Sequence, residues 1–177
     1  RHGDAAAATV EMGRATFQPG ALPCTATVDE LIQQPIEAAG RSLQFTGVSV
    51  GNPHCVIFKQ PGEAWTREDL LTLGPALENH SLFPKRTNVQ LAVPTGPKDI
   101  FILIWERGAG ETQASGSSSC AAASAAVRLG LVKGPVTVKM PGGTLNIEVA
   151  QDFSLTMKGP VAEVARGALS PSFVRGL

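Results

Sequence analysis

Glu106 and Arg107 form an acid–base pair directly after an apolar run, residues 100–105, that predicts a buried strand. An arginine guanidinium binds a carboxylate through two parallel hydrogen bonds, whereas a glutamate accepts from an ammonium group or tunes a neighbouring acid. Adjacent opposite charges are usually solvated surface residues, but a glycine-rich loop follows this pair, which favours a binding site. Together the two side chains suit a ligand that carries both an ammonium group and a carboxylate, such as an amino acid.

The residues after this loop predict a helix start that binds an anion. Residues 116–119, Gly-Ser-Ser-Ser, open a helix that is built almost wholly of Ala and Ser and ends at Gly130. The first backbone N–H groups of a helix have no internal partner, and the helix dipole adds positive potential there. Serines at this position are most often ordinary caps. The anion site therefore requires that Ser115, just before the helix, faces the same pocket.

Three further polar residues are weaker candidates. Asn52 and His54 flank a proline in a turn, and Asn88 stands at the start of an apolar strand. An asparagine in a turn usually bonds its own backbone, and a lone histidine is more often structural than catalytic. None of the three indicates a site by itself.

The elements that must position these groups are mostly strands. The expected strands cover residues 9–12, 41–50, 54–58, 87–93, 99–105, 136–140, 145–149 and 153–157. Residues 1–8 are expected to be frayed and residues 24–40 to be mostly loop. Many strands with few helices indicate an α+β fold.

Two helices are expected between these strands. Thr66 and Asp69 form a capping-box pattern that starts an amphipathic helix to about Asn79, which the Gly74-Pro75 pair should kink or break. The helix at residues 117–130 has no amphipathic face, and its small side chains indicate close contact with neighbours all round. A curved mixed or antiparallel sheet wrapped round this central helix fits the composition. An ordinary helix on one face of a sheet remains an alternative.

Composition excludes several classes of function. The 177 residues suffice for one domain with a core, the formal net charge is zero, and no basic stripe indicates nucleic acid or an anionic membrane. The apolar runs have strand length, so no membrane span is expected. Three scattered cysteines, Cys24, Cys55 and Cys120, fit a reducing cytoplasm and no zinc site. We expect no metal, PLP or nucleotide cofactor. Because the sequence begins with Arg1 and has no initiating Met, we expect it to belong to a longer chain.

Four phrases of the sequence resemble the diaminopimelate epimerase family, in that family's order and spacing. They are GNPHCVIF at residues 51–58, FPKRTNV at 83–89, WERGAGET at 105–112 and PGG at 141–143. The resemblance extends from residues 10–13 to residues 159–160 and corresponds to the C-terminal half of the family enzyme. It implies a connection from a missing N-terminal domain at residues 1–13, an epimerase-like domain at 14–160 and a tail at 161–177 that returns toward the missing domain.

The family enzyme inverts a stereocentre of an amino acid without a cofactor, and its tendency to dimerise makes a homodimer a candidate assembly. The resemblance implies that four side chains hold the distal end of the substrate: Asn52, Asn88, Glu106 and Arg107. The N–H groups of Gly116 and Ser117 would hold the carboxylate at the reacting carbon. His54 and Glu106 would adjust the acidity of a catalytic pair that consists of two cysteines in the family, one from each domain.

Ser115 stands at the position of one of these catalytic thiols. The family has Ala-Cys-Gly-Ser/Thr-Gly where this chain has Ala-Ser-Gly-Ser-Ser at residues 114–118. A free thiol titrates near pKa ~8.5, and a serine hydroxyl is far less acidic. The change indicates a diverged epimerase, a one-thiol lyase or isomerase, an engineered Cys-to-Ser substitution or an inactive relative. Ser118, where the family has glycine, favours natural divergence.

The Gly-Asn-Gly segment with the family's other catalytic cysteine is absent from these 177 residues. Since the family's site lies between two domains, the chain is expected to be half a site and to lack epimerase activity in isolation. Two alternatives stay open. One is an amino-acid racemase or isomerase of the same fold with a different substrate, and the other is a non-catalytic amino-acid-binding relative.

Overall fold

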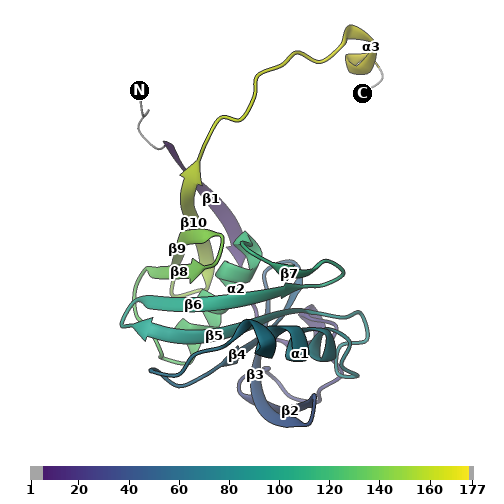
Figure 1. Cartoon of the computed structure of the whole chain (residues 1–177), viewed down its shortest axis with the longest axis vertical. Helices are drawn as coiled ribbons and strands as arrows, with labels where there is room; N and C mark the ends of the chain where they lie inside the picture. Colours follow the sequence, from purple (N-terminus) through teal and green to yellow (C-terminus); the bar gives the residue numbers. More distant parts are fainter. Residues whose placement is uncertain (1–5, 176–177) are drawn as a thin grey trace.

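A curved, ten-stranded mixed sheet organises the chain in the computed structural model, which describes residues 6–175 (Figure 1). The elements in chain order are β1 (Ala6–Arg14), η1 (Pro19–Ala21), β2 (Gln34–Ala38), β3 (Arg41–Ser49), β4 (Pro53–Phe58), α1 (Arg67–Glu78), β5 (Asn88–Gly96), β6 (Asp99–Glu106), β7 (Gly110–Thr112), α2 (Gly116–Arg128), β8 (Val136–Met140), β9 (Gly143–Val149), β10 (Ser154–Val161) and α3 (Pro171–Val174). The strand order is β1-β10-β9-β8-β6-β5-β4-β3-β2, and β7 pairs with β6. The expected α+β class is confirmed.

The two main helices lie on opposite faces of this sheet because of the strand directions. Strand β4 is parallel to β5 and β6 is parallel to β8, whereas β5 and β6 are antiparallel. Helix α1 connects the first parallel pair and α2 connects the second. Right-handed crossovers between pairs that run in opposite directions place their helices on opposite faces. Each helix therefore has its own hydrophobic core.

Helix α2 lies inside the curve of the sheet. Nine consecutive residues, from Ser118 to Ala126, are buried, and the helix contacts β3, β4, β5, β6, β8, β9 and β10. Only small side chains allow strands to approach a helix this closely on several sides, because a Leu or Phe would hold the backbones apart. This confirms the prediction of a small-residue helix wrapped by a curved sheet. It also places the start of α2 at one end of the core.

Helix α1 covers the outer face and begins as expected. The Thr66 hydroxyl accepts from the backbone of Asp69, and the Asp69 carboxylate accepts from the Thr66 backbone, which completes the capping box. The sequence predicted a kink or a break at Gly74-Pro75, and the break is wrong, because the helix continues to Glu78. Pro75 removes one hydrogen bond, to the carbonyl of Leu71, which lies on the exposed side of the helix where water can replace it.

Three local predictions were also wrong. Residues 6–8, expected to be frayed, begin β1 and pair with β10, while residues 1–5 lie outside the described part of the chain. Residues 34–38, expected to be loop, form β2, which a tight turn at Ala39 and Gly40 joins to β3. Both turn residues have positive φ, 49° and 72°, so this is a hairpin turn without the usual Asn-Gly signature. Strand β7 lies within the expected glycine loop.

The β1–β10 ribbon extends beyond the two cores. Figure 1 shows it rising away from the rest of the sheet, with the chain after β10 running out to α3. Every described residue after Val161 is exposed. The two cores therefore form without this tail. Among the described residues, no helix is both long and apolar enough to cross a membrane.

Candidate active site

Asn88 joins the segments on which the predicted site residues lie. It is the first residue of β5, is buried, and pairs in register with His54 of β4. Its Nδ2 donates to the Pro53 carbonyl at 2.8 Å, and its Oδ1 accepts from the Arg107 backbone N–H at 3.0 Å. One asparagine thus connects the start of β4, the start of β5 and the loop after β6. The parallel pairing of β4 with β5 brings these residues together.

His54 is fully buried and neutral. Its Nε2 lies 3.0 Å from Asn52 Oδ1, which orients the turn asparagine toward the imidazole. Burial is the main cause that lowers the pKa of His54; Gln90 beside it opposes the shift, the positive charge of Arg107 adds to it, and the resulting pKa is about 3. The side chain therefore contributes a neutral ring with a fixed direction, and it carries no charge at physiological pH.

Gln90 connects this cluster to α2. It is fully buried on β5, two residues after Asn88, and its Nε2 donates to the Ser118 hydroxyl at 3.0 Å. Two buried side-chain atoms of the described residues have no partner, His54 Nδ1 and Gln90 Oε1. Sequence reasoning missed Gln90. The signal that could have found it is a polar residue in an otherwise apolar strand, since a buried amide needs partners.

Ser115 is the N-cap of α2, as its position before the helix suggested. Its hydroxyl accepts from the Ser118 backbone N–H at 3.4 Å, and its carbonyl accepts from Ser119. The N–H groups of Gly116 and Ser117 have no acceptor among the described residues. Gly116 lies under the thioether of Met157, where an added Cβ would come within 3.0 Å of the sulfur. The helix start therefore presents two free donors beneath an apolar cover.

A pocket of about 270 Å³ opens beside this helix start. It is lined by Ala114, Ser115, Gly116, Met140, Gly142, Gly143, Thr144, Leu145 and Pro160. The lining contains Ser115 and Gly116 but neither Glu106 nor Arg107. This pocket therefore lies at the helix start alone. Gln90 and Asn88, two residues apart on β5, contact Ser118 of α2 and the backbone of Arg107, respectively.

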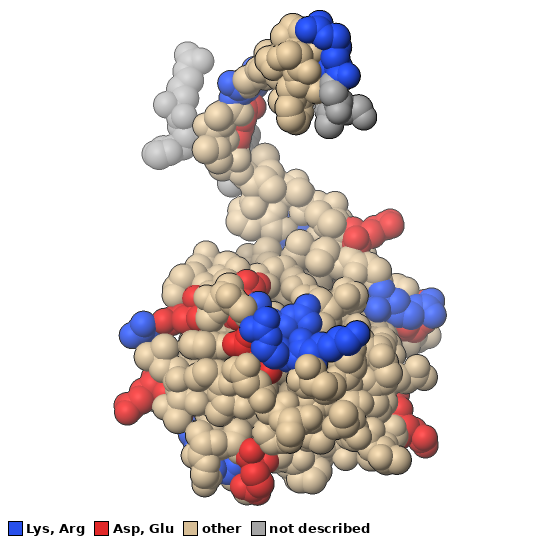
Figure 2. All heavy atoms as spheres, turned by 90° about the vertical axis from the view of Figure 1, so that its right-hand side faces the viewer, with Lys and Arg blue, Asp and Glu red and all other residues tan. Residues whose placement is uncertain are grey.

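Glu106 and Arg107 face different surroundings. Glu106 is half-buried, lies on the same face of β6 as Ile104, which packs against α2, and has the Thr112 hydroxyl 3.5 Å from its Oε2. The exposed Arg107 donates from Nη1 to the Lys85 carbonyl at 3.1 Å, which leaves its other guanidinium donors for a ligand. Figure 2 shows Lys and Arg side chains gathered near the middle of one face, with carboxylates beside them.

Glu78, at the end of α1, holds the loop that carries this pair. Its Oε1 accepts from the Gly108 backbone at 2.8 Å and from Arg86 Nη1 at 2.9 Å, and its Oε2 accepts from Trp105 Nε1 at 2.8 Å. The residue is 5% exposed. Sequence reasoning missed Glu78, because its partners lie 8 to 30 residues away and no short pattern indicates them.

The buried cysteines do not provide a reactive thiol. Burial raises the pKa of Cys120 to about 12 and raises that of Cys55 further. Their thiolates are therefore not populated at neutral pH, and the thiolate is the reactive form. No group of three or more His, Cys, Asp or Glu within residues 6–175 could hold a metal ion.

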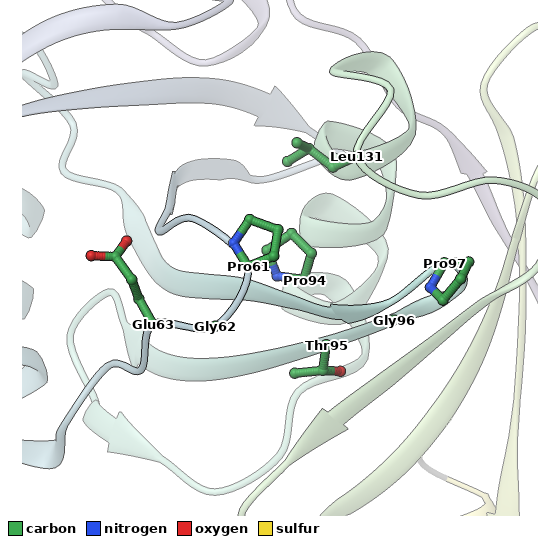
Figure 3. A pocket seen from close by; sticks show the side chains of 8 residues that line it. All are labelled: Pro61, Gly62, Glu63, Pro94, Thr95, Gly96, Pro97 and Leu131. Carbon is green, nitrogen blue, oxygen red and sulfur yellow. The ribbon is translucent and has the colours of Figure 1, made fainter.

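Another pocket lies at the opposite end of the core. It has about 530 Å³ and is lined mainly by residues 61–63, residues 94–97 and Leu131 (Figure 3). Leu131 follows the C-terminal end of α2, about 20 Å from its start at ~1.5 Å per residue. The labelled lining is mostly proline rings and backbone with one carboxylate, Glu63, and lacks convergent polar groups. The amino end of α2 is therefore the better candidate for the functional site.

Comparison with known proteins identifies the family. The family model described as diaminopimelate epimerase matches residues 46–164. The diaminopimelate epimerase of Desulfitobacterium hafniense is 39% identical over 160 residues, and diaminopimelate epimerase 2 of a Nostoc species is 42% identical over 161 residues. These matches cover 90% and 91% of this chain but 56% and 55% of the relatives. The chain belongs to the diaminopimelate epimerase family and spans a little over half the length of these relatives.

Solved structures of low sequence identity share the fold. A hydroxyproline epimerase from Agrobacterium vitis, solved with trans-4-hydroxy-L-proline, superposes with a TM-score of 0.59 at 12% identity, over 90% of this chain and 51% of that one. A protein from Pseudomonas aeruginosa described as a predicted epimerase gives 0.57 at 23% identity, over 95% and 60%. Both likenesses support the expected epimerase-like fold.

Proposed function

We propose that the chain is the C-terminal half of a cofactor-independent amino-acid epimerase that converts LL- to meso-diaminopimelate. The observation that carries the proposal is the hydrogen-bonded cluster around Asn88, together with Gln90 on the same strand, which donates to Ser118 in the first turn of α2, where two N–H groups are free. Family membership and relatives named diaminopimelate epimerase at about 40% identity support the same substrate. The proposed compartment is the cytoplasm, where three free cysteines stay reduced.

The chemistry requires stabilisation of negative charge at a carboxylate. The α-proton of an amino acid is a very weak acid, and its removal moves charge onto the neighbouring carboxylate. In the proposal the N–H groups of Gly116 and Ser117 donate to that carboxylate, and fixed donors of this kind stabilise developing charge without reorganising. The apolar cover from Met157 excludes water and strengthens these interactions.

The proposed contacts to the distal end of the substrate differ in strength. The free donors of Arg107 bind a carboxylate and Glu106 accepts from an ammonium group. Asn88 already uses both side-chain atoms internally, so its main role is to position Arg107, with one donor hydrogen left for the substrate. Asn52 has its amide nitrogen free, because its oxygen faces His54.

Inversion also needs an acid and a base on opposite faces of the reacting carbon. Ser115 occupies one of these positions in the proposal, and its hydroxyl donates a proton or orients a water. The group on the other face belongs to the part of the relatives that this chain does not cover, so we propose that the site closes against that part.

The test is α-proton exchange of diaminopimelate in deuterated solvent, measured by NMR on the complete protein. We expect Ser115→Cys to raise the exchange rate by about 10-fold or more, because a thiol near pKa ~8.5 ionises far more readily than a hydroxyl. Ser172→Cys on the exposed α3 is the matched control and should leave the rate unchanged. An unchanged rate in a folded Ser115→Cys protein contradicts the placement of Ser115.

A non-catalytic amino-acid-binding protein is the second candidate. The observation that favours it is the N-cap role of the Ser115 hydroxyl, which gives this side chain a structural function that needs no chemistry. In that case calorimetry would show binding of diaminopimelate, and neither the wild type nor Ser115→Cys would exchange the α-proton.

A further inference from the structure

The position of Glu78 does not serve the stability of its own helix. It is the last residue of α1, where the negative end of the helix dipole disfavours a carboxylate, and the last turn holds no basic residue. The charge is also buried, which costs free energy unless donors surround it. Three donors do so, from Arg86, Trp105 and Gly108. The local cost and the complete set of partners indicate a role beyond helix formation.

The partners of Glu78 belong to the two segments that carry the site. Arg86 lies two residues before Asn88, and the Glu78 carbonyl accepts from the backbone of Thr87 at 3.3 Å. Trp105 and Gly108 flank Glu106 and Arg107 on either side. Glu78 therefore fixes both ends of the contact between Asn88 and the backbone of Arg107 without itself facing the pocket at α2.

Two partners of Glu78 have unusual backbone conformations that its carboxylate helps to hold. Arg86 has a φ of +59° and Gly108 a φ of +81°, so both occupy the left-handed region, which is unfavourable for a residue with a side chain such as Arg86. The two approach closely, since an added Cβ on Gly108 would lie 3.9 Å from the Arg86 guanidinium. Glu78 Oε1 accepts from both residues and holds the loops at this separation.

We propose that Glu78 is a positioning residue that sets the distance between the Glu106–Arg107 pair and Asn88, and hence the fit for the distal amino-acid end of the substrate. This inference rests on the proposed function. A neutral glutamine in its place has one acceptor and one donor facing three donors, so at least one contact turns repulsive. An aspartate keeps the charge but is one methylene shorter and cannot reach all three partners.

The test compares two substrates in the complete protein, diaminopimelate and 2-aminopimelate, which lacks the distal amino group. We expect Glu78→Gln and Glu78→Asp to lower kcat/KM for diaminopimelate by about 10- to 100-fold, mainly through KM, because a displaced positioning group costs this much. For 2-aminopimelate the loss should be below about threefold, since fewer distal contacts remain to be lost. The matched control is Glu68→Gln, the same substitution at an exposed site on the same helix.

The outcomes separate positioning from stability. A lowered melting temperature with unchanged kinetics would assign Glu78 a structural role alone and overturn the inference, as would equal losses for both substrates. If the wild type exchanges no α-proton, the proposed reaction fails, and the Kd of diaminopimelate from calorimetry replaces KM. An unchanged Kd in Glu78→Gln then overturns the inference separately, and a wild type that neither exchanges nor binds overturns both.

Discussion

At the scale of single residues, the site side chains are already engaged with one another before a ligand arrives. Asn88 uses both of its side-chain atoms, Asn52 faces His54, and Ser115 caps α2. Such internal bonds orient a polar group at little further entropic cost when a ligand binds. Arg107 and the first turn of α2 keep free donors that suit carboxylates, and Asn52 keeps its amide N–H groups.

The buried His54 makes stability depend on pH. Its folded pKa of about 3 lies below the ordinary 6.5, so between these values the unfolded chain binds a proton that the folded protein does not. Stability is therefore fully present above pH 6.5 and falls as the pH drops through this window, by about 3 kcal/mol at pH 4.5 and at most about 5 kcal/mol. Asp69, whose pKa is lowered to about 2, adds its own loss only at lower pH.

Urea unfolding at pH 7 and pH 4.5 measures this effect. We expect His54→Gln to lower stability at pH 7, because the buried contact to Asn52 changes, but to flatten the difference between the two pH values. A variant with the same pH dependence as the wild type would show that another group carries the acid sensitivity.

At the scale of elements, the sequence predicted features that depend on neighbouring residues and missed features that depend on contacts with distant segments or with solvent. The capping box at Thr66 and the small-residue helix are each determined by residues close together in the sequence, so local rules predicted both. Strand β2 was missed because its turn uses an Ala-Gly pair in place of a common hairpin signature. The uninterrupted α1 was missed because the effect of Pro75 depends on which side of the helix faces water.

Gly74 is required by the packing of α1 on β6. An added Cβ would lie 2.6 Å from the Trp105 ring, which is backed by the core and also holds Glu78 through its indole N–H. We expect Gly74→Ala to destabilise the protein by about 1–3 kcal/mol through overpacking. Differential scanning calorimetry should show a lower Tm.

Gly20→Ala provides the control for this substitution. Gly20 is exposed, and an added Cβ there meets nothing within 4 Å. Its Tm should stay the same or rise slightly, because alanine restricts the unfolded chain more than glycine does. Equal Tm values for the two variants would show that Trp105 yields to the new methyl group and that the contact is not tight.

At the scale of the whole molecule, the family motifs predicted the fold and pointed to Asn88 as a candidate site residue, but they did not indicate the buried groups that connect the segments. The residues that make the connections, Gln90 and Glu78, are polar groups buried by strands and helices distant in sequence. Their roles depend on the register of β4 with β5 and on the packing of α1 on β6. Residue spacing predicts neither this register nor this packing, because both depend on contacts between segments that are distant in sequence.

The proposed division of the reaction between this chain and the part of the relatives that it does not cover leads to a prediction for residues 1–177 alone. Within residues 6–175 the start of α2 offers the Ser115 hydroxyl, while the buried thiols of Cys55 and Cys120 stay protonated at neutral pH. Epimerisation needs a proton acceptor on one face of the reacting carbon and a donor on the other. We therefore expect the isolated chain to bind diaminopimelate weakly and to exchange no α-proton in deuterated solvent over several days.

Calorimetry measures the binding and NMR the exchange, with heat-denatured chain as the blank. Measurable exchange above this blank would show that one half holds a complete acid–base pair, and the two-sided mechanism would then have to be abandoned.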